Sequence, residues 1–215
     1  MTVSQLSLYN GALRECKARK LLNLSEPREA RFLLDDVWGD GGVTSGAVRY
    51  CLEDGMWGFA TRTASVDYDP DYVPDFGMLY RFPQPTDFVR TVSLCVDDHF
   101  NEPLTQYSEE TGAWYSDLQT IFVKYVSNDP TAGLDFTQWP ESFVLFVERY
   151  MAFRIVGKLT KSQAAEDALE KKMMMAAKVA RSKAAMEQPA KFPPQGMLVK
   201  ARLGYWSQGN YRRGS

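Results

Sequence analysis

The fold is decided first by residues 140–159, which read PESFVLFVERYMAFRIVGKL. Pro140 suits the first turn of a helix, because the N–H that proline lacks would have no partner there. Large apolar side chains then recur three and four residues apart, as they do on the buried face of a helix. They are Phe143, Phe146, Val147, Tyr150, Met151 and Phe153. We expect a strongly apolar helix that ends at Lys158 and Leu159.

A second, longer helix is expected to follow directly and to reach about Glu187. Thr160 and Gln163 have the spacing of a capping box, with Thr160 as the N-cap. The interior is rich in alanine, methionine and lysine, which are strong helix formers. Three consecutive methionines cover much of a helix circumference, so small and flexible side chains lie on more than one side. We interpret this helix as a contact between identical subunits, with burial inside one domain as the alternative. The predicted contact residues are Met173, Met174, Met175, Ala177, Ala180 and Ala184.

Three shorter helices are predicted near the N-terminus. The first spans about residues 4–22, the second begins at Ser25 as its N-cap, and the third spans about residues 45–55. The glycine-rich run at residues 39–42 ends the second helix. Residues 1–60 and 128–187 are therefore expected to form one helical bundle.

Residues 61–127 have the punctuation and patterning of a β-rich insertion. Short β-prone runs occupy residues 60–68, 78–82, 89–96, 104–107 and 120–126. Glu110–Gly112, between residues 106–107 and residues 113–115, has the composition of a hairpin turn. The predicted fold class is α+β, mainly α: a helical bundle with a small antiparallel β-rich insertion and an extended C-terminal arm at residues 188–215.

Composition places the chain among ordinary soluble globular proteins. It has 215 residues, of which 45% are hydrophobic and 24% charged. No apolar run approaches the roughly 20 residues that cross a bilayer, and the N-terminus does not read as a signal peptide, so we expect a protein made in a cytoplasm without a membrane partner. Cys16, Cys51 and Cys95 match neither a metal pattern nor a disulfide framework, and we expect them to be small buried hydrophobes.

The arm differs from the rest of the chain in charge. Its 28 residues carry five basic side chains and no acid, and because the whole chain has a net charge of −2, the preceding 187 residues carry −7. Its prolines and glycines oppose helix, yet it is too apolar for a solvated tail, so we expect it to order on another chain rather than fold back on its own body. The predicted docking residues are Lys191, Phe192, Leu198, Lys200, Arg202, Tyr205, Trp206, Tyr211, Arg212 and Arg213.

The sequence contains few candidates for catalytic residues. His99 follows Asp97 and Asp98, but a metal site needs three or four ligands in defined geometry, so a solvated loop is the expected reading. Glu109 and Glu110 are neighbouring carboxylates beside the predicted turn, as a glycan hydrolase could use. No phosphate-binding loop or nucleophile elbow is present. We assign no catalytic residue, no cofactor and no metal.

An ordered series of short motifs carries a family resemblance. The motifs are Asn10–Leu13, Ser25–Pro27, Glu29–Arg31, Trp57–Ala60, Tyr80–Pro83, Pro85–Val92, Val123–Val126 and Asp129–Pro130, with Phe136 and an aromatic helix after them. Over about residues 8–186 this order resembles the head-to-tail adaptor (connector) family of short-tailed bacteriophages, which includes tail tubular protein A and portal-bound head completion proteins.

The resemblance implies a structural, non-enzymatic virion protein at the head–tail junction, assembled in the host bacterial cytoplasm. Family members form a ring, typically of twelve copies, with the portal protein above and a tail nozzle or tail tube protein below. Double-stranded DNA passes through the lumen without specific binding. Residues 191–213 occupy the place of the arm that reaches along the portal. Residues 39–46 depart from the family pattern, because they interrupt a region that is usually more helical, and the arm is longer and more aromatic. Two other functions remain open: a virion-associated peptidoglycan hydrolase, and a nucleic-acid-binding module that uses the basic arm.

Overall fold

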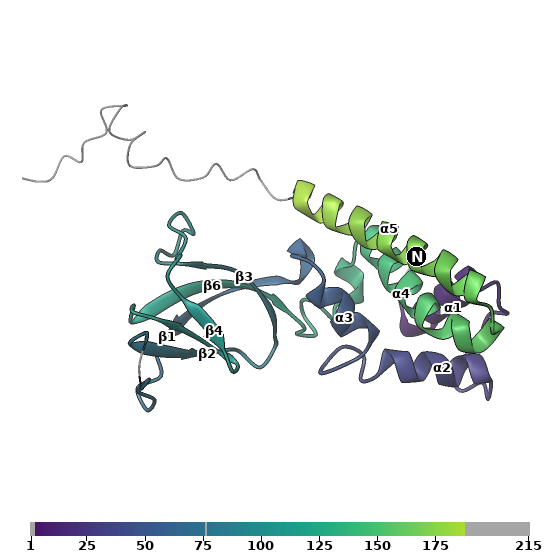
Figure 1. The fold of residues 1–215 in the computed structure, drawn as a ribbon, viewed down its shortest axis with the longest axis horizontal. Coiled ribbons are helices and arrows are strands. Elements are labelled where there is room, and N and C mark those ends of the chain that lie inside the picture. Colours follow the sequence, from purple (N-terminus) through teal and green to yellow (C-terminus); the bar gives the residue numbers. More distant parts are fainter. Residues whose placement is uncertain (1–2, 76, 188–215) are drawn as a thin grey trace, which may run out of the picture.

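The computed structural model describes residues 3–75 and 77–187. The fold is α+β, as predicted: a helical module lies beside a module of two small antiparallel sheets (Figure 1). The described part of the helical module contains α1 (Gln5–Glu15), α2 (Glu29–Trp38), α3 (Ala47–Glu53), α4 (Glu141–Thr160) and α5 (Gln163–Glu187), with two short 3₁₀ turns at Gly58–Ala60 and Phe136–Gln138. No helix among the described residues is both long enough and apolar enough to cross a membrane.

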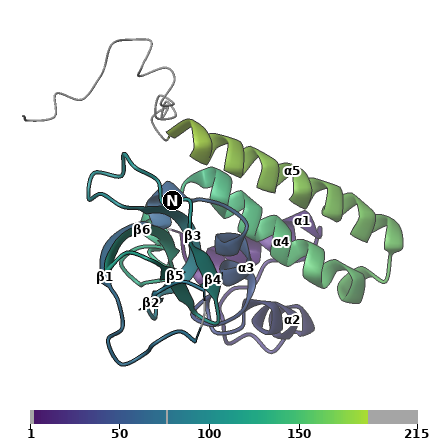
Figure 2. The same ribbon diagram turned by 60° about the vertical axis from the view of Figure 1, so that its left-hand side comes forward.

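Helix α4 is the centre of the helical module. It contacts each of the other four helices, and α5 runs back along it in an antiparallel hairpin (Figure 2). Phe143, Phe146 and Met151 are almost completely buried, as the helical spacing of this segment predicted. Burial of such side chains stabilises a fold by about 1.5–3 kcal/mol each, so α4 organises the main core.

Helix α1 is shorter than predicted, because it ends at Glu15 rather than near Leu22. Lys17 adopts a left-handed backbone conformation with φ of 57°, which turns the chain back along the helix. The side chain of Asn10 then holds the returning segment: its Oδ1 accepts from the N–H of Leu21 at 2.7 Å, and its Nδ2 donates to the carbonyl of Leu21. Leu21 is therefore buried against α1, although it is not part of the helix.

Two predicted helix caps are wrong. Helix α2 begins at Glu29 instead of after Ser25, because the chain is still extended at Arg28, where φ is −123° and ψ is 143°. Thr160 belongs to the last turn of α4 and donates to the carbonyl of Val156. Lys161 makes a left-handed turn, and the hydroxyl of Ser162 accepts from the N–H of Ala165 at 3.4 Å at the start of α5.

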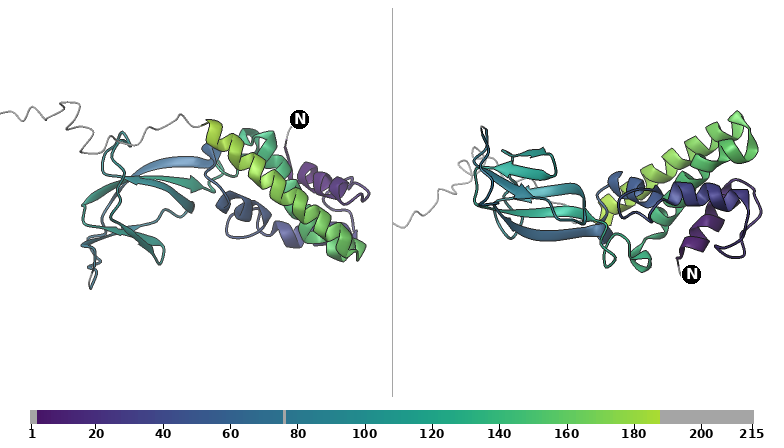
Figure 3. Two further views of the ribbon diagram at one scale, coloured as in Figure 1. Left: turned by 45° about the horizontal axis from the view of Figure 1, so that its top comes forward. Right: turned by 90° about the horizontal axis from the view of Figure 1, so that it is seen from below.

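The β-rich segment forms two three-stranded sheets instead of the single sheet expected. One has the order β1 (Thr61–Asp67), β6 (Thr120–Ser127), β3 (Phe88–Cys95), and the other β2 (Tyr80–Pro83), β5 (Ala113–Ser116), β4 (Ser108–Glu110). Between them lies a second core, separate from that of the helices (Figure 3). Its buried members are Phe82, Leu94, Trp114, Ile121, Val123 and Tyr125.

The predicted hairpin turn is confirmed between β4 and β5. Thr111 and Gly112 both have positive φ, of 47° and 72°, as a two-residue turn between twisted strands requires. The predicted strand at residues 104–107 is wrong, because pairing with β5 begins only at Ser108. The central strand β6 is partly buried on both faces, as its mixed pattern predicted.

Trp57 lies at the joint of the two modules, where the hydroxyl of Thr61 in β1 donates to the Trp57 carbonyl at 2.7 Å. Its side chain is 1% exposed, and its Nε1–H donates to the carbonyls of Cys51 at 2.9 Å and Leu52 at 3.1 Å. Its ring packs edge-on against Phe143 of α4 with centroids 4.9 Å apart. Arg49 and Arg90 add contacts across the joint, by donating to the carbonyls of Phe88 and Glu53 respectively. The sheets are thus held firmly against the end of α3.

The three cysteines are buried, as predicted. Cys16 is 9% exposed, Cys51 0% and Cys95 2%. Burial raises the pKa of the Cys16 thiol to about 11 and that of the Cys51 thiol well above its usual value, so both are protonated and weakly nucleophilic at neutral pH.

Candidate interaction surface

The negative charge of the folded part of the chain lies on the β module. Residues 61–127 contain eleven carboxylates and four Lys or Arg side chains, which gives a net charge of −7. The helical segments 1–60 and 128–187 carry net charges of −1 and +1, which cancel. The excess predicted for residues 1–187 is therefore concentrated in one module, and the other module is nearly neutral.

The loop between β1 and β2 is largely exposed, and its described residues are 68–75 and 77–79; we call them the acidic loop. It contains Asp69, Asp71 and Asp75 and no basic residue. Asp69 pairs with Arg81 at 2.7 Å, whereas Asp71 and Asp75 form no ion pair with any residue that the structure describes. Val73 is 82% exposed, so the loop combines unpaired negative charge with an apolar tip.

Helix α5 places the predicted subunit-contact residues on different faces. Ala177, Ala180 and Ala184 are 5%, 1% and 8% exposed and pack inside the helical core. Their assignment to a subunit contact is corrected, because their helical spacing matches the inner face of α5, which already lies against α4. Their small side chains allow that close approach. Met173 is partly buried against the same core.

The outer side of α5 carries a second apolar stripe. Met174 and Met175 are 55% and 68% exposed, so these two predicted contact residues do face solvent in the isolated chain. Met175 is one of a set that recurs at intervals of four and seven residues, which places its members on one side of the helix. The set, which we call the outer stripe, is Ala164, Ala168, Met175, Val179 and Met186.

A groove of about 430 Å³ lies between α4 and α5, beside the outer stripe; we call it the α4/α5 groove. Leu145, Met175 and Val179 give it an apolar surface. Basic side chains border it, and the lining includes one carboxylate, Glu141. The basic lining residues are Arg149, Lys172 and Lys183.

Glu15 ties part of this basic border to α1. Its carboxylate accepts from Nζ of Lys172 at 2.9 Å and lies 3.5 Å from Nε of Arg149. Burial acts to raise the pKa of Glu15, but the hydrogen bonds and charges of Lys172 and Arg149 together outweigh it and lower that pKa. Lys183 has no such partner among the described residues. The groove therefore offers apolar surface together with one lysine, Lys183, that forms no ion pair with a described residue.

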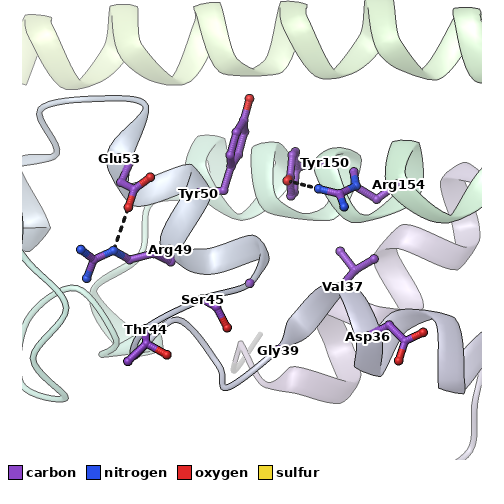
Figure 4. Close-up of a pocket in the computed structure, with 11 residues that line it drawn as sticks. Asp36, Val37, Gly39, Thr44, Ser45, Arg49, Tyr50, Glu53, Tyr150 and Arg154 are labelled. Atoms are coloured by element: carbon purple, nitrogen blue, oxygen red, sulfur yellow. Dashed lines mark hydrogen bonds and ion pairs between the residues drawn. The ribbon is translucent and has the colours of Figure 1, made fainter.

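A second groove, of about 400 Å³, lies where α2, α3 and α4 meet (Figure 4). Its most ordered feature is the stacked pair of Tyr50 and Tyr150, whose ring centroids are 4.3 Å apart. Arg154 donates to the hydroxyl of Tyr150 at 2.7 Å, and Arg49 pairs with Glu53 at 2.9 Å. These polar groups hydrogen-bond to one another, which leaves them less able to bind a charged ligand. The stacked tyrosines hold α3 against α4.

Residues 39–46 form one wall of this groove. The hydroxyl of Thr44 and the backbone N–H groups of Gly42, Thr44 and Ser45 all donate to the carboxylate of Asp40. These bonds, led by that of the Thr44 hydroxyl, lower the pKa of Asp40 to about 2. Gly46 is required at the end of the loop: its φ is +98°, and an added Cβ would lie 1.9 Å from the carbonyl oxygen of Trp38. Residues 39–46, where the sequence departs from the pattern of the adaptor family that it resembles, thus form a loop held by hydrogen bonds to Asp40.

The remaining chemical candidates do not form a site among the described residues. His99 is a solvent-exposed side chain 3.6 Å from Asp98, and no group of three or more potential metal ligands occurs in residues 3–75 and 77–187. Glu109 and Glu110 are consecutive strand residues, so their side chains point to opposite faces. Glu109 accepts from Gln84 and Thr91.

No known family model matches this chain, and no curated protein matches its sequence. The predicted docking residues between Lys191 and Arg213 lie outside the described residues. The acidic loop and the α4/α5 groove were not among the surfaces predicted from the sequence. A signal for the first was present, since residues 68–79 hold three aspartates and no base. The groove had none, because it depends on how α4 and α5 pair.

Proposed function

We propose that this chain is a non-enzymatic structural subunit of a tailed bacteriophage, which assembles into a ring below the portal and joins head to tail. The ordered motifs support this, since Trp57, Phe59 and Ala60 lie at the joint of the two modules, where the hydroxyl of Thr61 in β1 donates to the Trp57 carbonyl. The observation that carries the proposal is the pair of unsatisfied surfaces at separate places on one molecule: the acidic loop and the α4/α5 groove with its outer stripe.

A ring requires two different contact surfaces on each copy, because its contacts are head-to-tail and close by rotation. An exposed apolar stripe is costly on a subunit that stays alone and useful on one that assembles. The net charge of −7 on the β module also suits a DNA conduit. A negative surface repels the duplex or holds it only weakly and so lets it pass, whereas each basic contact would add salt-sensitive affinity. We propose twelve copies, with the portal above and a tail nozzle or tail tube protein below.

Residues 188–215 are proposed to dock on the portal. They follow α5, whose last turns are exposed at Met186 and Glu187. Large aromatic side chains such as Trp206 are typical anchors of protein interfaces, and a segment that orders on binding gains affinity when many copies act together.

The test is binding of the full chain and of residues 1–187 to immobilised portal protein from the same phage. We expect truncation to abolish binding and to leave the circular dichroism spectrum and the unfolding transition of residues 1–187 intact. Full binding by the truncated chain would show that the arm does not dock there.

A further inference from the structure

We propose that neighbouring copies join by inserting the acidic loop of one copy into the α4/α5 groove of the next. This names the contact within the proposed ring and rests on that proposal. The occupant of the groove is thus a second copy of the same chain, contributing the described residues 68–75 and 77–79 of the acidic loop.

The loop offers the right chemistry for a basic, apolar groove. Val73 and Leu79 are 82% and 64% exposed, and Tyr72, whose ring lies 4.8 Å from the Arg81 guanidinium, is 46% exposed, so the loop presents three apolar or aromatic side chains to solvent. Asp71 and Asp75 flank Val73 and pair with no described basic side chain. A cation brought close to them would find carboxylates whose charge no ion pair already neutralises.

The groove offers the complementary chemistry. Met175 and Val179 are 68% and 51% exposed, and Lys183 lies beside them without an acidic partner in the described chain. Methionine adapts to irregular partners, which suits a rim that must accept a loop. A volume of about 430 Å³ falls within the range of roughly 300–1,000 Å³ typical of binding pockets, so it can take a few side chains.

The two surfaces cannot meet within one chain. The acidic loop hangs from the end of the β module that is farthest from the helices, whereas α4 and α5 lie on the other side of the joint at Trp57 (Figures 1 and 3). Contact between them therefore needs two copies, and it is head-to-tail, because each copy contributes a different surface. Such a contact repeats around an axis, as ring closure requires.

Cysteine cross-linking of the full chain tests this contact. Val73→Cys and Val179→Cys are made in separate chains that carry tags of different mass, and the two proteins are mixed and oxidised. The three native cysteines are at most 9% exposed, so the new thiols react selectively. We expect a disulfide-linked heterodimer, and peptide mass spectrometry should locate the bond between positions 73 and 179. A short bifunctional thiol reagent serves as a second readout that tolerates wider separations than an S–S bond.

The matched control mixes Val73→Cys with Val43→Cys, since Val43 is also exposed, at 56%, but lies outside the groove. We expect the yield of the 73–179 heterodimer to exceed that of the 73–43 pair at least tenfold. Equal yields with both reagents would overturn the proposed contact.

Charge reversal gives an independent readout by sedimentation. Lys183→Glu and Asp75→Lys should each weaken self-association of the full chain about tenfold, and the two changes together in one chain should restore it, because every copy supplies both surfaces. Lys178→Glu, on α5 but outside the groove lining, should have little effect. Assembly that is insensitive to both single changes would contradict the contact while leaving the ring itself standing. A chain that neither self-associates nor joins a portal would instead contradict the proposed function.

Discussion

At the scale of single residues, Glu148 is a buried charge for which Gly11 makes room. Its side chain is on the inner part of α4, and its Oε2 accepts from Arg14 at 3.1 Å. A Cβ added at Gly11 would lie 2.0 Å from the carboxylate, so α1 and α4 approach here only because residue 11 has no side chain. Nothing in the sequence pattern marks this, since Asn10–Leu13 looks like an ordinary helical stretch.

We predict that Gly11→Ala lowers the free energy of unfolding by about 1–3 kcal/mol, because the methyl group overpacks the site and displaces Glu148 from Arg14. Urea unfolding measures this. In a Glu148→Ala background the same change should cost much less, because the carboxylate is gone. An equal loss in both backgrounds would show that some other contact is responsible.

The pH dependence of stability should also report on Glu148. Burial raises the pKa of its carboxyl, and Arg14 only partly opposes this. The folded state therefore holds this proton more tightly than the unfolded chain, so the contribution of Glu148 is most favourable below its unfolded pKa, about 4.3, and is lost as pH rises through the folded pKa. We predict that the stability of Glu148→Gln relative to the parent chain rises over that window. A relative stability that falls with rising pH would show that the pKa of Glu148 is lowered, not raised, in the folded state.

At the scale of elements, the strongest apolar patterns and the β4–β5 hairpin turn were predicted correctly, whereas several helix ends were not. Helix α4 and strand β6 follow from dense periodic apolar residues. Lys17 and Lys161 end helices by adopting positive φ. Lysine rarely adopts this conformation, so its presence in the sequence does not predict a helix end there. The division into two sheets depends on which strands pair across long stretches of chain, which local propensity does not encode.

Helix α5 packs one face into its own core, and its opposite face is the one that we propose contacts a neighbouring copy. Ala180 and Val179, which are adjacent in sequence, lie on these two faces. We predict that Ala180→Asp, at a position 1% exposed, destabilises the chain by about 3 kcal/mol or more, because it buries a charge. Val179→Asp, at 51% exposure, should change stability by less than about 0.5 kcal/mol and should weaken self-association. Thermal unfolding and sedimentation measure the two effects. A stable Ala180→Asp protein would refute the assigned inner face.

The joint at Trp57 should behave as part of one cooperative unit. Trp57→Phe keeps an aromatic ring but removes the N–H that reaches the carbonyls of Cys51 and Leu52. We predict a loss of about 1–3 kcal/mol, since buried carbonyls lose their side-chain donor. Hydrogen exchange should show weaker protection in both α3 and β1. Weakening confined to one module would mean that Trp57 does not couple them.

At the scale of the whole molecule, charge and shape are divided in the same way. The acidic β module lies at one end, the nearly neutral helical module at the other, and the basic residues 188–215 follow α5. Opposite charges on separate parts of one chain favour contacts between copies and partners over a solitary state. The charge imbalance could be predicted by counting residues. That the negative charge lies on one structural module could not, because it depends on the two sheets forming a unit with its own core.

The most direct test of the adaptor proposal is a mass measurement of the full chain, alone and mixed with the portal protein of the same phage. We predict a monomer or a weak oligomer alone, and with the portal a single complex whose added mass corresponds to a closed ring, twelve copies by our proposal. A chain that leaves the mass of the portal unchanged at micromolar concentrations would contradict the account.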